Sequence, residues 1–207
     1  MTEPARPLTL PDREGARRWP AQGKWTLEDY RQLPEDGQRY EVIRGHLYVS
    51  PAPTILHQRI LHRLDRALDH FVVAHGLGEV LAAPLDVLLP RGIATPVEPD
   101  LIFFRTGNKP RAGASNFSGV PDLVIEVLSP GTRRLDTQVK LPAYLDAGIP
   151  EVWHADSQDR TLVVYGLSED RKSYVVVSRG GEGETVVSRV LAGFRVEVSE
   201  IFAPEPE

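Results

Sequence analysis

The chain has 207 residues, 41% of them hydrophobic, and a formal net charge of −5, which suits one domain with a core of its own. Cysteine is absent, which excludes disulfides, thiolate metal sites and cysteine nucleophiles and fits a reducing compartment. No segment approaches the roughly 20 apolar residues that cross a bilayer, and the N-terminus lacks the apolar segment of a secretory signal. We therefore expect a cytoplasmic protein with no membrane partner.

The negative charge argues against tight, non-specific coating of DNA, which needs clustered Lys and Arg. It does not exclude a nuclease. An active site that holds cations with carboxylates is locally acidic, and a few local arginines can still bind the phosphate backbone.

The N-terminal half predicts an arm, a helix, a hairpin and a long helix. Residues 1–22 are rich in Pro, Arg and Glu and lack periodicity, which is typical of a flexible arm ahead of a domain over 23–203. Thr26 predicts the N-cap of a helix over 26–33. Two short strands are expected over 39–49, with a turn at residues 44–45. Apolar residues recurring every three or four positions predict a helix over 54–75.

The rest of the chain predicts mainly strands, at 79–89 with a break at Pro84, at 100–104 and at 121–128. The apolar strand 121–128 should be central. A second helix is expected over 132–147, with Pro142 tolerable only in its first turn or at a kink. Further strands are predicted at 151–155, 161–165 and 173–177, with a short strand and a helical turn at 194–202. We expect a single α/β domain.

An acid inside a strand that should be buried is the most informative feature. Side chains alternate faces along strand 121–128, so Glu126 shares a face with Asp122 and Val124 and lies between the apolar residues Ile125 and Val127. An unpaired ionised carboxylate there would cost several kcal/mol or more. Glu126 must therefore find a cation, a hydrogen-bond donor or water.

Asp100 repeats this pattern, because it begins the strand 100–104, directly before its apolar residues, and follows Pro99. If the strands 100–104 and 121–128 are neighbours, Asp100 and Glu126 can approach each other. A divalent cation would relieve the repulsion between their carboxylates. Mg²⁺ prefers one or two protein carboxylates together with waters and phosphate oxygens, and it can activate water for phosphodiester hydrolysis.

Two further residues could complete such a site. Lys140 lies on the helix that follows strand 121–128, and a helix that folds back across the sheet could direct it toward Glu126. A lysine there would orient the attacking water or hold a phosphate. Glu41, in the first hairpin, could complete the coordination shell of the cation.

Several segments of the chain resemble the Uma-two family of endonucleases, which belongs to the PD-(D/E)xK, restriction-endonuclease-like superfamily. The resemblance runs over residues 25–202, and its motifs occur in the family order at residues 40–47, 98–103, 121–130, 140–144 and 147–153. It implies a mixed central sheet flanked by helices. It also implies hydrolysis of DNA phosphodiester bonds with Mg²⁺ or Mn²⁺.

The resemblance also assigns roles to residues. Asp100 matches the motif aspartate, Glu126 the acid of the second half-motif and Glu41 the N-terminal acid, so that these three would hold the metal. The lysine expected two residues after Glu126 is absent, because position 128 is Leu. The family pattern supplies a lysine from the following helix instead, which here is Lys140.

Arg133, Arg134 and His57 are weaker candidates for contacts to the substrate phosphate. Each candidate also has a purely structural interpretation. Glu126 could be a core acid satisfied by Arg133 or by a backbone donor, and Asp100 could cap a turn. Lys140, Glu41 and the three weaker candidates could be solvated surface residues.

Two other functions stay open. The fold could be a non-catalytic module that binds a nucleic acid or a protein, or it could be a structural subunit that acts only as an oligomer. For a nuclease we expect a homodimer, since cutting both strands of a duplex needs two active sites. DNA is the expected substrate, and the sequence does not exclude RNA.

Overall fold

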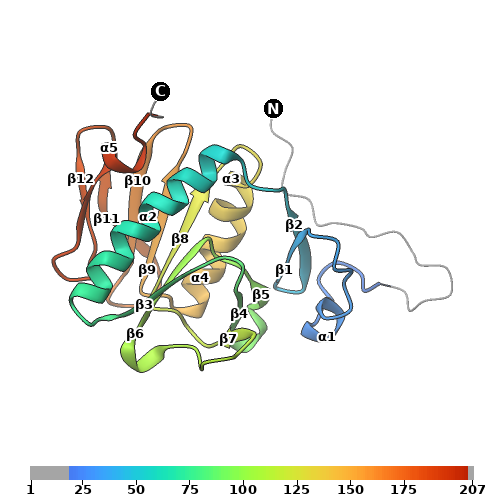
Figure 1. Ribbon diagram of the computed structural model, residues 1–207. Coiled ribbons are helices and arrows are strands. Elements are labelled where there is room, and N and C mark those ends of the chain that lie inside the picture. Colours follow the sequence, from blue (N-terminus) through green and yellow to red (C-terminus); the bar gives the residue numbers. More distant parts are fainter. Residues whose placement is uncertain (1–18, 205–207) are drawn as a thin grey trace.

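The computed structural model describes residues 19–204 and consists of three sheets and a few helices (Figure 1). The helices are α1 (Leu27–Tyr30), α2 (Ile55–Ala74), α3 (Arg133–Leu135), α4 (Leu141–Ala147) and α5 (Val198–Ile201). Three short helical turns accompany them: η1 (Pro90–Gly92), η2 (Thr106–Asn108) and the π-helical η3 (Asp136–Lys140). Within the described residues, no helix is both long and apolar enough to span a membrane.

Six strands form the largest sheet, in the order β11-β10-β9-β8-β6-β3. Only β8 and β9 are parallel, and the helical segment from α3 to α4 connects them, as a parallel pair requires. The strands are β3 (Gly78–Ala82), β6 (Leu101–Arg105), β8 (Leu123–Leu128), β9 (Glu151–Asp156), β10 (Thr161–Leu167) and β11 (Tyr174–Gly180). The apolar strand β8 is internal to this sheet and entirely buried, as predicted.

A five-stranded sheet lies beside it, in the order β2-β1-β5-β4-β7. Its strands are β1 (Arg39–Ile43), β2 (His46–Ser50), β4 (Asp86–Leu89), β5 (Ala94–Val97) and β7 (Asn116–Ser118). The strands β12 (Thr185–Val187) and β13 (Arg195–Glu197) form a separate pair. The break predicted at Pro84 is where the chain leaves one large sheet for the other. The short strands β5, β7 and β12 were not predicted, because each has only three or four residues, too few for an alternating pattern to stand out in the sequence.

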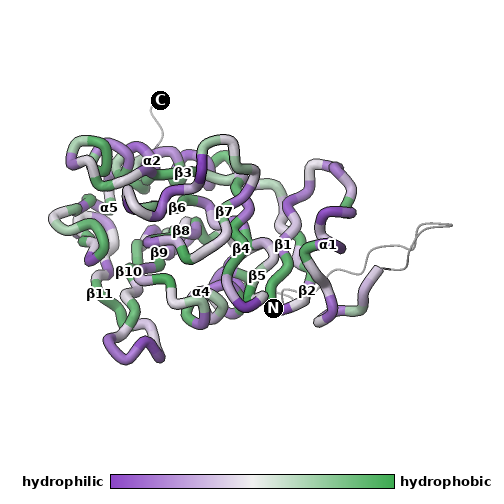
Figure 2. The backbone as a smooth tube through the Cα atoms, turned by 90° about the horizontal axis from the view of Figure 1, so that it is seen from below, coloured by the Kyte–Doolittle hydropathy of each residue, from purple (hydrophilic) through white to green (hydrophobic). Residues whose placement is uncertain are grey.

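Two apolar layers enclose the six-stranded sheet. On one face, α2 packs residues such as Ile60, Leu64 and Leu68 against Ile125 of β8. On the other face, α4 and the five-stranded sheet pack against residues that include Val124. Figure 2 shows α2 and α4 on opposite sides of β8 and β9. The mixed sheet flanked by helices therefore agrees with the predicted fold class.

The predicted helix over 54–75 is α2 with its N-cap. Thr54 has an extended backbone, and its hydroxyl accepts a hydrogen bond from the His57 N–H at 3.2 Å, which satisfies one free donor of the first turn. The N-cap at Thr26 is also confirmed, with a reciprocal hydrogen bond to Asp29, although α1 ends earlier than predicted.

Residues 1–18 of the predicted N-terminal arm lie outside the described residues. Residues 19–22, the end of the predicted arm, contact the domain. The ring of Trp19 stacks on Trp25 with 5.5 Å between centroids, and the side chain of Gln22 accepts a hydrogen bond from the Leu47 N–H.

Gly78 allows β3 to approach β6, and a stability test follows. A Cβ atom at position 78 would lie 1.9 Å from the Phe104 carbonyl oxygen, so Gly78→Ala must displace one strand. We expect the free energy of unfolding to fall by about 1–3 kcal/mol in urea denaturation. Gly107→Ala is the matched control, because a Cβ there would meet nothing within 4 Å. Equal stability of the two variants would contradict the predicted clash.

Candidate active site

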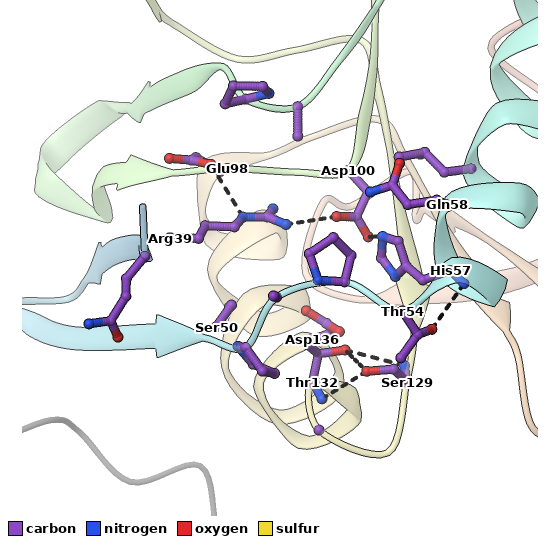
Figure 3. A pocket seen from close by; sticks show the side chains of 18 of the residues that line it. Arg39, Ser50, Thr54, His57, Gln58, Glu98, Asp100, Ser129, Thr132 and Asp136 are labelled. Carbon is purple, nitrogen blue, oxygen red and sulfur yellow. Dashed lines mark hydrogen bonds and ion pairs between the residues drawn. The ribbon is translucent and has the colours of Figure 1, made fainter. Parts of the chain in front are cut away.

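A pocket of about 760 Å³ opens where four segments of the chain meet. Arg39 of β1, His57 at the start of α2, Asp100 before β6 and the loop over residues 129–132 all line it. Figure 3 shows Arg39 and His57 approaching the Asp100 carboxylate from two sides. The pocket therefore lies above one of the acids that the sequence singles out.

The predicted neighbourhood of Asp100 and Glu126 is confirmed. β6 and β8 are antiparallel neighbours with Leu101 opposite Ile125, so that Asp100 and Glu126 stand next to each other on adjacent strands and face the same side of the sheet. The Val127 N–H donates a hydrogen bond of 2.8 Å to Asp100 Oδ2. Asp100 is 4% exposed and Glu126 is 1% exposed, so both carboxylates depend on protein partners.

Lys140 is the central cation of the site. Its Nζ lies 2.7 Å from Glu126 Oε1, 3.1 Å from Glu41 Oε1 and 3.7 Å from Asp136 Oδ1, and it donates a hydrogen bond to the carbonyl oxygen of Glu98. Lys140 is 1% exposed, which excludes the interpretation as a solvated helix residue. The predicted contact between Lys140 and Glu126 is thus present in the structure.

The helix that carries Lys140 is not regular, which corrects the expectation of one helix over 132–147. The turn over Asp136–Lys140 is π-helical and precedes α4, where Pro142 lies in the first turn. Proline has no N–H to donate to the preceding turn, and π-helical turns recur at functional sites. Asp136 and Lys140 are both buried within this turn.

Glu41 joins the cluster from β1 and is fully buried. Its Oε1 accepts a hydrogen bond of 2.8 Å from the Glu98 N–H in addition to the ion pair with Lys140. The Ser50 hydroxyl donates to its other oxygen at 3.4 Å. The interpretation of Glu41 as a solvated strand residue is therefore wrong.

Four partners of the cluster were not predicted from the sequence. Arg39 Nη1 donates to Asp100 Oδ1 at 2.8 Å, and Arg39 Nε lies 3.3 Å from Glu98 Oε2. The Tyr144 hydroxyl donates to Glu126, and Asp136 faces Lys140 from one turn earlier. The spacing of four between Asp136 and Lys140 was a usable signal, whereas nothing local links Arg39 to Asp100.

The three weaker candidates for phosphate contacts differ in their position relative to the pocket. His57 lines the pocket, with its Nε2 3.7 Å from Asp100 Oδ2. Arg133 forms ion pairs with Asp156 and Asp159, Arg134 is exposed, and neither arginine is among the residues that line the pocket. The partners of Glu126 are Lys140 and Tyr144, so Arg133 does not satisfy it.

The cluster contains more acidic than basic side chains. Five buried acids (Glu41, Glu98, Asp100, Glu126 and Asp136) surround two cations, Arg39 and Lys140. Burial raises the pKa of Glu98 to about 7 and also raises the pKa of Glu126 and of Asp136. Burial acts in the same direction on Asp100, but the charges of Arg39, Lys140 and His57 outweigh it and hold its pKa below the usual value.

A divalent cation fits this donor set in its chemistry. Carboxylate oxygens are the ligands that Mg²⁺ and Mn²⁺ prefer, and a bound ion would favour the ionised forms of Glu126 and Asp136 against burial, which raises the pKa of both. Among residues 19–204, however, no three acidic or histidine side chains are already arranged as metal ligands. Arg39 and Lys140 take oxygens that a metal would need.

The raised pKa values of the buried acids predict that the free energy of unfolding decreases as pH rises through neutrality. Between pH 6.5 and about 8, the folded carboxyls of Glu98, Glu126 and Asp136 retain protons that the unfolded chain has lost. This stabilisation is complete below their ordinary pKa and is lost as pH rises through the folded pKa values. We expect the free energy of unfolding to fall by about 1–2 kcal/mol across this window.

Urea denaturation in EDTA at several pH values measures this slope, and Glu126→Gln should flatten it. Burial and Lys140 lower the pKa of His154 to about 4, so its opposite contribution to stability changes only below pH 6.5, its ordinary pKa. A free energy of unfolding that rises with pH above 6.5 would contradict the assigned proton uptake.

A mixed sheet flanked by helices, with strand-borne acids and a buried lysine beside a pocket, defines a protein of the restriction-endonuclease-like class. The sequence profile of the Uma2 (Uma-two) family, described as "Putative restriction endonuclease", matches residues 27–199. The chain belongs to this family. No curated protein matches the sequence significantly.

A solved structure supports the fold. It is described as a putative nuclease belonging to DUF820 from Anabaena variabilis ATCC 29413. It matches with a TM-score of 0.72 and 22% identity, over 86% of this chain and 97% of that chain. At this identity the likeness shows the shared fold.

Proposed function

We propose that the protein is a divalent-metal-dependent endonuclease that hydrolyses DNA phosphodiester bonds. One observation carries the proposal: Asp100 and Glu126 face the same side of two adjacent strands, Lys140 lies 2.7 Å from Glu126, and the pocket opens above Asp100. Membership of a family described as "Putative restriction endonuclease" supports a nucleic acid as the substrate. Metal dependence and the choice of DNA are the finer parts of the proposal.

Asp100, Glu126 and Glu41 are the proposed metal ligands, with Mg²⁺ or Mn²⁺ as the ion. A bound ion would supply an activated water and would stabilise negative charge on the phosphate in the transition state. The surrounding residues preorganise the ligands. The Val127 N–H fixes Asp100, whereas Lys140 holds Glu126 and Glu41 together.

Lys140 would further favour the ionised form of Glu126, which is the form that binds a metal. Its ammonium group lowers the pKa of Glu126 against the larger effect of burial. If a water enters beside Glu126, the lysine could also orient it for attack. His57, 3.7 Å from Asp100 at the pocket wall, would face an incoming phosphate.

The test compares cleavage of supercoiled and linear DNA with Mg²⁺, with Mn²⁺ and with EDTA, for wild type and Glu126→Ala. We expect wild type to nick or cut only with a metal ion, and Glu126→Ala to be inactive in every condition. Glu126→Gln, which preserves the side-chain volume, controls for loss of the fold. Identical behaviour of wild type and both variants would refute the catalytic proposal.

One observation favours the rival, a non-catalytic binding module: Arg39 and Lys140 already neutralise part of the acidic cluster. Calorimetric titration separates the two proposals. A metal-dependent enzyme should give saturable heat with Mn²⁺ that Glu126→Ala abolishes, whereas the module should give none.

The proposal includes a cytoplasmic homodimer. Two copies would allow both strands of a duplex to be cut, and the lack of cysteine suits a reducing compartment. Light scattering with and without duplex DNA would determine the assembly, and a mass of one chain, about 23 kDa, in both samples would exclude the dimer.

A further inference from the structure

Arg39 has a singular position in the pocket. Among the described residues that line it, Arg39 is the one arginine or lysine, and the other ionisable side chains include His57 and the acids Glu98, Asp100 and Asp136. Lys140 does not line the pocket and is buried among carboxylates. A phosphate group that enters this pocket would therefore meet Arg39 as its permanent cation.

The guanidinium of Arg39 has donors to spare. Nη1 binds Asp100 and Nε lies near Glu98, but Nη2 is buried and has no hydrogen-bond partner in the described structure. A buried donor without a partner is unfavourable, and an incoming hydrogen-bond acceptor would relieve this cost. A guanidinium presents its donors as a planar fork that matches two oxygens of a phosphate.

Arg39 also competes with a metal. Asp100 Oδ2 accepts the Val127 N–H, and Arg39 takes Oδ1, so a cation that binds Oδ1 must displace the guanidinium. Arg39 can be displaced more readily than Lys140, because its side chain is 25% exposed against 2%. It is also the first residue of β1 and faces the open pocket.

We propose that Arg39 holds Asp100 in the metal-free protein and moves to the substrate when Asp100 binds a divalent cation, there donating two hydrogen bonds to phosphate oxygens of the DNA backbone. This inference rests on the proposed nuclease function. Arg39 would thus neutralise Asp100 in place of the divalent cation in the metal-free protein, and bind phosphate once the cation is present.

The test measures two affinities that should change in opposite directions in Arg39→Met. Mn²⁺ affinity, measured by calorimetry, should increase roughly tenfold, because a competing cation is removed. Affinity for a fluorescent duplex of about 20 base pairs, measured by anisotropy in Ca²⁺, should decrease roughly tenfold or more. Inorganic phosphate in the presence of Mn²⁺ should follow the duplex.

Two variants act as controls. Arg105→Met removes another arginine that pairs with an aspartate, since Arg105 Nε lies 3.2 Å from Asp122 Oδ1 away from the pocket, and it should leave both affinities unchanged. Arg39→Lys retains the charge and should recover part of the duplex affinity without the two-pronged contact. Thermal unfolding of each variant verifies that it is folded.

The outcomes separate the two proposals. If wild type binds Mn²⁺ and cleaves DNA while Arg39→Met binds the duplex as well as wild type does, the role of Arg39 is refuted and the nuclease proposal stands. Weaker Mn²⁺ binding by Arg39→Met and by Arg39→Lys would also refute it. If wild type neither binds Mn²⁺ nor cleaves, the nuclease proposal fails and the inference fails with it.

Discussion

Replacing Lys140 with methionine is expected to lower the free energy of unfolding by about 3–5 kcal/mol, the typical cost of removing one partner from a buried ion pair. Lys140 is enclosed by Glu41, Glu126 and Asp136 and donates to the Glu98 carbonyl. Without the ammonium group these buried acids lose the cation that their ionised forms need. Urea denaturation at neutral pH in EDTA measures the loss.

Two comparisons make this expectation specific. Lys172→Met changes an exposed lysine and should alter stability by less than about 0.5 kcal/mol. Adding Glu126→Gln to Lys140→Met should recover part of the loss, because one of the buried acids left without its cation is then replaced by a neutral side chain. If Lys140→Met is as stable as Lys172→Met, the buried cluster does not depend on its lysine.

Asp100→Asn is expected to reduce metal-dependent cleavage at least about 100-fold, since it removes a proposed metal-binding charge worth several kcal/mol in the transition state. It should also destabilise the fold by about 1–3 kcal/mol. Both oxygens of Asp100 accept hydrogen bonds, from Arg39 and from the Val127 N–H, whereas asparagine offers one acceptor and presents an NH₂ group to the other donor.

Asp122→Asn is the matched control at the opposite end of the β6–β8 pair. Asp122 accepts the Arg105 N–H at 3.0 Å and pairs with the Arg105 side chain, so that its substitution removes the same kinds of interaction outside the pocket. We expect comparable destabilisation with cleavage close to that of wild type. Cleavage reduced equally in both variants would mean that Asp100 supports the strand pair and takes no part in chemistry.

Local patterns in the sequence were sufficient for most elements and for four residues of the cluster. Helical periodicity predicts α2, alternation predicts β8, and the acid within each apolar strand identifies Asp100 and Glu126. These signals can be read from a few neighbouring residues. A buried carboxylate in a strand needs a partner whatever the strand packs against, so the acid is informative before its partner is known. Lys140 and Glu41 were candidates from their places in the helix after strand 121–128 and in the first hairpin, and the resemblance to the family assigned them roles in the same site.

The pairing of charges depended on packing between distant segments. Arg39 and Asp100 are 61 positions apart, and their contact arises only when β1 pairs with β5, in the segment that leads to Asp100 and β6. Glu98 and Lys140 are 42 positions apart, and the π-helical turn orients that lysine. Composition and periodicity predict which face of an element is buried. The tertiary packing of the sheets determines which charged side chains on those faces form pairs.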